Sequence, residues 1–226
     1  MISTGVSPRW FTLAAAVAVT ACSAPTHSPS ASSTPRPGQA INVNQDNIRR
    51  VRGAFPPGFE VTETRGEASP ATFWGLKPGW SSQPPECGAL ADPAVGGSSP
   101  PQGFSGSGDG GIVYVIVAAS ASGAEPDPGA VAACSHWSME SGRTSAIVDS
   151  FAPAVDGVST FGMITAIRTV VEGGTETDLR ATTVTAYLGE YVAFVTVVTD
   201  PGAQPSALPD DLAQTMLTKT VATLRR

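Results

Sequence analysis

The sequence predicts an α+β domain, in which an antiparallel sheet packs with a few helices and one disulfide closes the fold. Three observations favour this class. Four strand-like runs follow one another in the second half of the chain, and helix-like segments lie before and after them. Short turns separate the runs, which indicates hairpins, since a parallel sheet needs a long crossover between strands. Two cysteines remain available for a disulfide once a third is assigned to the N-terminal region.

The four strand-like runs carry β-branched and aromatic residues at residues 144–151, 161–171, 179–188 and 191–198. Glycine turns at 173–174 and 189–190 separate the later runs, and the last two form the clearest hairpin. Two earlier strands are predicted at 59–64 and 112–117.

The segment from Gly106 to Gly111 matches G-x-G-x-x-G, the pattern of a dinucleotide-binding loop. That motif has to follow a strand and open a helix, whereas here a β-branched strand follows it. We therefore interpret Asp109-Gly110 as a hairpin turn.

Helix-like patterns flank the strands. Asp46 is expected to cap a short helix, which Phe55-Pro56-Pro57-Gly58 ends. Its arginines, Arg49, Arg50 and Arg52, lie toward its C-terminus, where cations suit the helix dipole. A last helix begins at Leu208-Pro209-Asp210 and turns four apolar residues toward the sheet: Leu212, Met216, Val221 and Leu224.

Further helical segments are predicted near the cysteines. Ser69-Pro70 starts a helical turn through Trp74, and residues 87–91 form one short helix. A longer helix is predicted from Asp127 through Trp137 to Gly142. Its residues Ala130, Cys134 and Trp137 follow an i, i+4, i+7 pattern, which places the cysteine on the buried face.

The N-terminal region indicates where the protein works. Residues 1–21 have a basic residue followed by an apolar stretch too short to span a bilayer, which is typical of a signal peptide. Val19-Thr20-Ala21-Cys22 fits a lipobox, so we expect Cys22 to be acylated and to anchor the protein at the outer face of the cell membrane. A plain secreted protein with a chance cysteine is the alternative. Residues 22–40 form a Ser/Pro-rich tether, and residues 41–226 form one domain.

The remaining cysteines, Cys87 and Cys134, form an even pair in an oxidising envelope, which indicates a disulfide. Two separate buried thiols are the alternative. The chain carries a formal net charge of −6 and no basic stripe. We therefore expect neither a nucleic-acid partner nor electrostatic adhesion to anionic lipid.

No catalytic, metal-binding or cofactor-binding motif is found. His27 lies in the tether, so His136 is left as the histidine of the domain, which excludes a site with several histidine ligands. The patterns G-x-S-x-G and S-x-x-K are absent. Glu60, Glu63 and Asp149 are candidates for a carboxylate pair, although strand acids are usually only solvated.

Trp74 and Trp80 are the candidate ligand-binding residues, because both lie in the loop-rich segment 66–102, and loops on a rigid scaffold often carry recognition. The alternative, which we prefer, is that both tryptophans cover the core.

Several motifs together resemble those of small mycobacterial lipoproteins of an uncharacterised family. They are the lipobox, the tether, Phe-Pro-Pro-Gly-Phe, Ser69-Pro70-Ala71-Thr72-Phe73-Trp74-Gly75, Pro85-Glu86-Cys87 and Cys134-Ser135-His136-Trp137. More loosely, the layout resembles the extracellular sensor domain of PknH-type serine/threonine kinases. That second resemblance implies an antiparallel sheet with helices and a ligand cleft.

The function expected from the sequence is that of a non-catalytic envelope lipoprotein, which binds a small ligand or an envelope protein. Two alternatives are a hydrolase centred on His136 and a lipid carrier with an apolar cavity.

Overall fold

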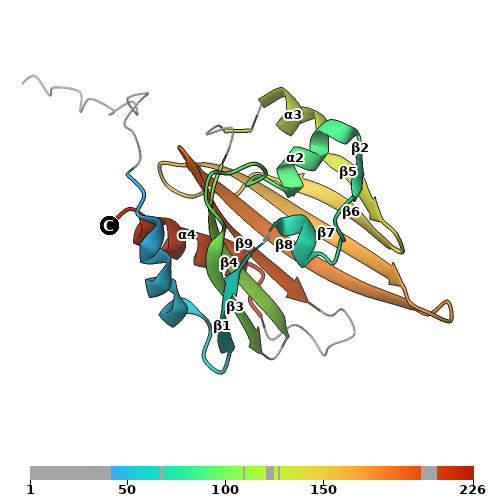
Figure 1. Cartoon of the computed structure of the whole chain (residues 1–226), viewed down its shortest axis with the longest axis horizontal. Helices are drawn as coiled ribbons and strands as arrows, with labels where there is room; N and C mark the ends of the chain where they lie inside the picture. Colours follow the sequence, from blue (N-terminus) through green and yellow to red (C-terminus); the bar gives the residue numbers. More distant parts are fainter. Residues whose placement is uncertain (1–41, 67–68, 109, 121–124, 127, 200–207) are drawn as a thin grey trace, which may run out of the picture. The chain divides into compact units, whose positions relative to one another are not determined.

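A nine-stranded antiparallel sheet is the framework of the domain (Figure 1). The computed structural model describes residues 42–66, 69–108, 110–120, 125–126, 128–199 and 208–226. The strand order is β1-β3-β4-β9-β8-β7-β6-β5-β2, and every adjacent pair is antiparallel. The predicted fold class is confirmed. The predicted signal peptide, Cys22 and the tether all lie outside the described residues.

The strands are β1 (Glu60–Arg65), β2 (Ser81–Gln83), β3 (Gln102–Gly108), β4 (Gly111–Ala119), β5 (His136–Ser141), β6 (Thr144–Phe151), β7 (Ser159–Val170), β8 (Glu176–Leu188) and β9 (Tyr191–Thr199). The helices are η1 (Gln45–Ala54), α1 (Pro70–Phe73), η2 (Pro85–Cys87), α2 (Gly88–Ala91), α3 (Pro128–Ala133) and α4 (Leu212–Leu224), of which η1 and η2 are 3₁₀-helices.

Two hairpins follow the predicted turns. Leu188 pairs with Tyr191, so the β8–β9 hairpin turns at residues 189–190 as the sequence predicts. Gly108 pairs with Gly111, so β3 and β4 join through residues 109–110. Asp109 itself lies outside the described residues, but the hairpin confirms that this Gly-rich segment is not a loop that opens a helix.

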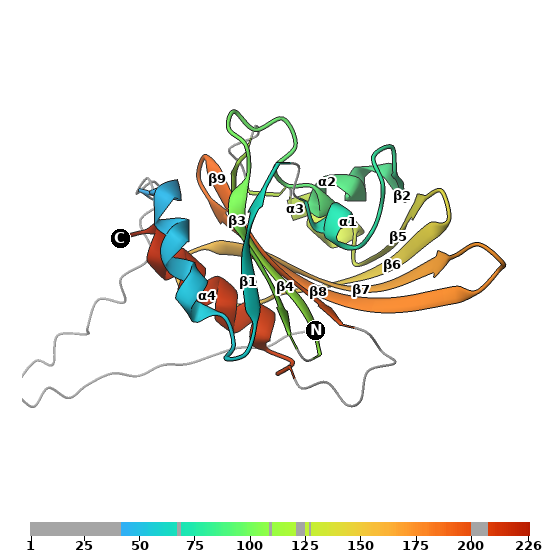
Figure 2. The same cartoon turned by 60° about the horizontal axis from the view of Figure 1, so that its bottom comes forward.

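One face of the sheet packs against α4 and η1, which lie side by side (Figure 2). Alternate residues of the central strands point into this layer, among them Val115 of β4 and Val195 of β9. The four apolar residues predicted on the last helix are all buried there. This layer fixes α4 and η1 to the middle of the sheet.

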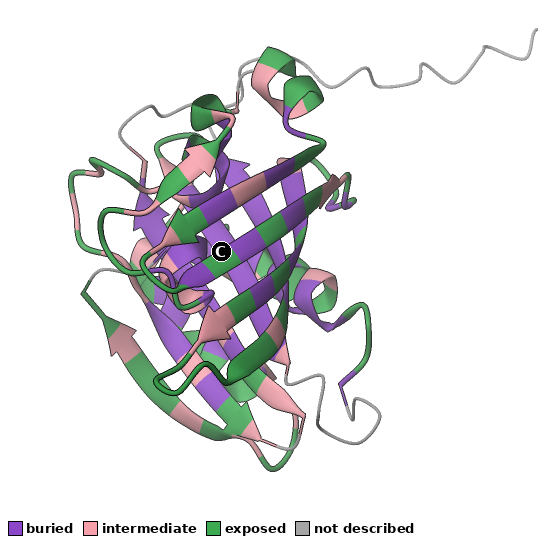
Figure 3. Ribbon diagram, turned by 90° about the vertical axis from the view of Figure 1, so that its right-hand side faces the viewer, coloured by how far each residue is buried: buried purple, intermediate pink, exposed green. Residues whose placement is uncertain are grey.

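The opposite face of the sheet packs against α1 and α2 and holds the disulfide. Away from the helices, the strands alternate buried and exposed residues, as the coloured ribbons of Figure 3 show. In β6, for example, Ala146 and Val148 are buried while Ile147 and Asp149 are exposed. The exposed residues of β6 lie on the same face of the sheet as α4, but beyond the area that α4 covers.

Two predictions at helix ends are wrong. Asn44, not Asp46, caps η1, because its side-chain oxygen accepts a hydrogen bond from the Asp46 amide at 3.1 Å. The helix predicted from Asp127 to Gly142 ends at Ala133, and His136–Ser141 form β5 instead. Pairing with β6 on one side and β2 on the other outweighs the helical spacing of Cys134 and Trp137.

The described helices include none that is both long enough and apolar enough to cross a membrane.

Candidate functional site

Trp74 connects α1 to the centre of the sheet. Ser69 and Thr72 form a reciprocal capping box at the start of α1, and Pro70 occupies the first turn. The short helix thereby places Trp74 against β8 and β9 with no exposed surface. Its indole Nε1 donates a hydrogen bond to Thr183 Oγ1 at 3.2 Å. Trp74 is therefore a core residue, and a ligand at the surface does not reach it.

The disulfide fastens the loop-rich segment to the rest of the domain. Cys87 at the end of η2 is bonded to Cys134 after α3, with an S–S distance of 2.05 Å and a Cα–Cα distance of 5.6 Å. Both cysteines are fully buried. The predicted bond is confirmed, and it joins η2 to the segment between α3 and β5.

Trp80, unlike Trp74, is only partly buried and lies just before β2. Its ring packs closely on the backbone of α2 at Gly88. A Cβ atom added at Gly88 would lie 2.9 Å from Trp80 Cζ3 and 2.8 Å from Ser82 Oγ. Glycine at this position therefore allows the edge of the indole to approach the helix backbone closely.

A pocket of about 740 Å³ opens beside Trp80. The loop between α2 and β3 forms its other wall, and this loop carries Val95, whose side chain is 65% exposed. The lining combines one aromatic ring, aliphatic groups, prolines and hydroxyls: Gly66, Ser69, Thr72, Pro78, Gly79, Trp80, Asp92, Ala94, Val95, Gly96, Gly97, Ser98, Ser99, Pro100 and Pro101. Among these residues Asp92 is the only charged one.

The outer wall of the pocket is anchored to the end of β4. The Gly97 amide donates a hydrogen bond to the Ala94 carbonyl at 3.1 Å, which closes a tight turn. A Cβ atom at Gly97 would lie 2.1 Å from the Ala119 carbonyl oxygen, so the loop backbone approaches β4 as closely as a glycine permits. Ser120 Oγ also donates to the Pro93 carbonyl at 3.2 Å. These contacts hold the wall that carries Val95.

A family model described as Domain of unknown function (DUF5642) matches residues 44–225. The chain belongs to this family. No curated protein matches it. It is similar to the X-ray structure of an uncharacterised protein, the Rv0999 ortholog, from Mycobacterium smegmatis. The two chains are 19% identical, the match covers 82% of this chain and 98% of the other, and the TM-score is 0.58. At this identity the likeness shows the fold alone.

The DUF5642 domain presents His136 on the exposed face of the sheet. His136 Nδ1 lies 2.7 Å from Asp149 Oδ1, and the two side chains are 66% and 63% exposed. The prediction that His136 lies toward solvent is correct, although a strand and not a helix places it there. Among the described residues no hydroxyl is hydrogen-bonded to the imidazole, and no group of three metal-ligating side chains occurs. His136 thus has an acid partner but no observed nucleophile.

The structure does not bring together the carboxylates considered from the sequence. Glu60 and Glu63 lie on β1 at one edge of the sheet, whereas Asp149 lies on β6, six positions away in the strand order. Glu63 Oε2 instead accepts a hydrogen bond from Arg65 at 2.8 Å. A pair of carboxylates for acid–base chemistry is therefore not formed by these residues.

Two tyrosines of the DUF5642 domain have a phenol pKa above the ordinary value. Burial raises the pKa of Tyr187, which is only 7% exposed, and to a lesser degree that of Tyr114. The Tyr114 ring stacks on Phe73 with ring centroids 3.9 Å apart. Both rings belong to the apolar cluster on the disulfide-bearing face of the sheet, and neither lines the Trp80 pocket.

Sequence reasoning did not distinguish the residues that line the pocket from those that do not. It singled out Trp74 and Trp80 together, whereas only Trp80 reaches the pocket. It also missed Val95. The signal that could have found Val95 is an isolated apolar residue within a run of Pro, Gly and Ser, where no helical or strand period gives it a place in the core.

Proposed function

We propose that this DUF5642 protein is a membrane-anchored envelope lipoprotein, whose domain binds a ligand without catalysing a reaction. The pocket lined by Trp80 and the Val95 loop carries the proposal, because it brings an aromatic ring and an exposed aliphatic residue to one cleft whose loop is anchored to the sheet. Such mixed clefts are the usual form of small-ligand sites. The lipobox at Cys22 supports the anchor, and the loose resemblance of the sequence layout to PknH-type sensor domains supports a sensor-like role.

The lining favours a neutral ligand with both apolar faces and hydroxyl groups. The described residues that line the pocket include no lysine or arginine that would select a phosphate or carboxylate. Trp80 offers an aromatic surface on which a sugar ring stacks, and the hydroxyls of Ser98 and Ser99 line the same pocket. We therefore assign the pocket to a neutral glycan, or to the sugar part of a larger envelope molecule.

The test is a binding titration of the mature chain, made soluble by Cys22→Ser, against a panel of neutral oligosaccharides. Tryptophan emission and calorimetry report binding. We expect saturable binding by the unaltered domain and a loss of at least about tenfold in affinity for Trp80→Ala, since a central aromatic commonly dominates a site. Trp80→Phe, which keeps an aromatic plane, should lose less.

Ile164→Ala serves as the matched control, because Ile164 is 43% exposed on the other face of the sheet. It should bind as the unaltered domain does. The proposal is overturned if no saccharide of the panel binds saturably, or if Trp80→Ala binds as well as the unaltered domain.

A hydrolase centred on His136 is the second candidate, and the contact with Asp149 favours it. An acid and the imidazole that it orients are two of the three members of a catalytic triad. The third member would be a nucleophile within hydrogen-bond distance of the other ring nitrogen. A lipid carrier remains a prediction from the apolar composition of the strands.

A further inference from the structure

Basic residues gather on the layer formed by η1 and α4. From residue 42 onward the chain has eleven lysines and arginines, and six of them lie on these two helices or directly after α4: Arg49, Arg50, Arg52, Lys219, Arg225 and Arg226. All six are exposed. The other five, Arg65, Lys77, Arg143, Arg168 and Arg180, are spread over the rest of the domain. The η1–α4 layer is thus a basic face on a chain of net charge −6.

The fold creates this face from segments far apart in the sequence. The Asn44 amide donates a hydrogen bond to the Leu224 carbonyl at 2.9 Å, and Asn47 Nδ2 donates to the Arg226 carbonyl at 2.8 Å. Arg50 follows Asn47 by one turn of 3₁₀-helix, which advances about 6 Å along the axis. The arginines of η1 and of the end of α4 are therefore neighbours, which the linear sequence did not indicate.

The carboxylates of this layer lie at the starts of its helices: Asp46 in the first turn of η1, where it lines the same pocket as Arg225 and Arg226, and Asp210 and Asp211 directly before α4. Elsewhere in the domain Arg65 pairs with Glu63, and Arg168 pairs with Glu176 and Asp178. Within the described part of the chain, the arginines of the basic face form no ion pair with a carboxylate. Arg225 donates to the Gly157 carbonyl and Arg52 to the Val61 carbonyl, and the Arg52 guanidinium also lies 5.9 Å from the centroid of the Phe104 ring, so their recorded partners are neutral groups.

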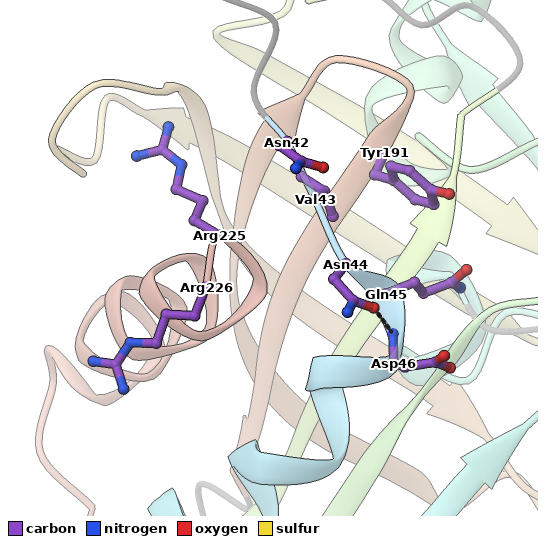
Figure 4. Close-up of a pocket in the computed structure, with 8 residues that line it drawn as sticks. All are labelled: Asn42, Val43, Asn44, Gln45, Asp46, Tyr191, Arg225 and Arg226. Atoms are coloured by element: carbon purple, nitrogen blue, oxygen red, sulfur yellow. Dashed lines mark hydrogen bonds between the residues drawn. The ribbon is translucent and has the colours of Figure 1, made fainter.

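The basic face is also where the chain leaves the domain toward Cys22. Asn42, the first described residue, lines a pocket of about 520 Å³ together with Tyr191, Arg225 and Arg226 (Figure 4). The predicted tether from Cys22 to this point has a root-mean-square reach of about 25 Å. If Cys22 is acylated, the basic face is the end of the domain that is attached closest to the bilayer.

We infer that the basic face of η1 and α4 docks on the anionic headgroups of the membrane that holds the lipid anchor, contrary to the expectation of no adhesion to anionic lipid that the linear sequence, without a basic stripe, suggested. Each basic side chain near an anionic surface contributes favourably, and the attraction acts within about one Debye length, roughly 10 Å at 0.1 M salt. The orientation rests on the lipid anchor of the proposed function. The Trp80 pocket lies on the opposite face of the sheet, so docking turns it away from the bilayer, where a glycan in the envelope can reach it.

The simpler explanation is that these cations only stabilise the C-termini of two helices. It accounts for Arg52 and for Arg225 and Arg226. It predicts a change in folding stability when the arginines are replaced, but no affinity for a membrane. Binding to vesicles therefore separates the two explanations.

The test uses the mature chain with Cys22→Ser, so that binding does not depend on acylation or on the pocket. Sedimentation with vesicles of equimolar phosphatidylglycerol and phosphatidylcholine is compared with pure phosphatidylcholine. The variant Arg49→Glu/Arg50→Glu reverses two charges of the basic face. Arg143→Glu/Arg180→Glu makes the same change in net charge on the β5–β6 turn and on β8, away from η1 and α4.

We expect binding to phosphatidylglycerol vesicles that weakens as salt rises, at least about a tenfold loss for the η1 variant, and less than about a twofold loss for the control. Equal melting temperatures establish that both variants are folded. Equal losses for the two variants would mean that only net charge matters and would overturn the inference. Equal binding to pure phosphatidylcholine, or no binding by the unaltered chain, would also overturn it. None of these results bears on glycan binding at Trp80.

Discussion

The indole of Trp74 donates a hydrogen bond to the hydroxyl of Thr183, 109 positions later in the chain. Thr183 Oγ1 in turn lies 3.0 Å from Thr196 Oγ1 on the neighbouring strand β9. All three residues have no exposed surface. Because a buried polar group is costly without a partner, this chain of contacts specifies where α1 sits on the sheet.

Trp74→Phe should lower the free energy of unfolding by about 1–2 kcal/mol, since it removes the donor and part of the packing. Thr183→Val should cost a similar amount, because it leaves the Trp74 N–H buried without a partner. Urea unfolding of both single variants and the double variant measures their coupling. Additive effects, with no coupling energy, would contradict the structural role of this hydrogen bond.

The strands were largely predictable because their apolar residues recur along runs with clear turns between them. The predicted strand 144–151 coincides with β6, and the strand predicted at 191–198 ends one residue short of β9. The apolar residues from Leu212 to Leu224 recur with a helical period, and this segment forms α4. These elements pack their apolar faces on a single core, so local pattern and tertiary contact agree.

The remaining errors occur where tertiary contacts decide between local alternatives. Trp137 and Met139 are both buried, as period-two packing requires, yet the spacing from Cys134 to Trp137 also fits a helix. Strand β3 was not predicted, because glycines inside a run weaken the strand pattern. In the structure, neighbouring groups occupy the space that a Cβ atom at Gly103 or Gly106 would need. Similarly, nothing in the sequence around Trp74 and Trp80 reveals which indole faces outward.

The disulfide should contribute substantially to stability. Cys87 and Cys134 are 47 positions apart, and the chain-entropy model assigns a loop of this length about 4 kcal/mol. Cys87→Ser/Cys134→Ser should lower the free energy of unfolding by roughly that amount, as measured by urea denaturation. The reduced unaltered protein is the control and should behave like the double variant. A loss below about 1 kcal/mol would show that the bond does not constrain the unfolded chain.

Cys22→Ala should release the protein from the membrane or leave its precursor uncleaved, since the lipobox cysteine is the predicted anchor. Detergent partitioning of cell fractions measures the first outcome and the mass of the protein measures the second. Cys87→Ser/Cys134→Ser is the matched control, because it changes cysteines without touching the lipobox. Unchanged membrane partitioning of Cys22→Ala would contradict the anchor.

Alkaline pH should destabilise the domain through Tyr187. Burial raises the pKa of its phenol in the folded state, whereas the unfolded value is about 10. The contribution of the Tyr187 phenol to the free energy of unfolding is fully present below about pH 10. It is lost as the pH rises above that value, because only the unfolded chain then releases the phenol proton. The free energy of unfolding of Tyr187→Phe should fall less steeply between about pH 9 and 11. Tyr191→Phe controls for the loss of a phenol, and parallel curves for Tyr187→Phe and the unaltered protein would refute the prediction.

His136→Ala should change the free energy of unfolding by no more than about 0.5 kcal/mol. Its contact with Asp149 is short, but both side chains are more than half exposed, and exposed ion pairs stabilise proteins only slightly. Glu63→Ala, which breaks the exposed Arg65–Glu63 pair, is the matched control. Glycan binding should also persist in His136→Ala, because His136 lies on the other face of the sheet from Trp80 and does not line its pocket.

The same variant decides between the binding module and the hydrolase. A catalytic imidazole needs a fixed partner on one nitrogen, which Asp149 supplies, and a nucleophile near the other. We expect purified protein to leave a panel of ester and amide substrates unchanged. If it hydrolyses them, and His136→Ala and Asp149→Ala lose that activity while Glu63→Ala keeps it at equal melting temperatures, then the exposed face of β5 and β6 is an active site and the non-catalytic proposal is wrong.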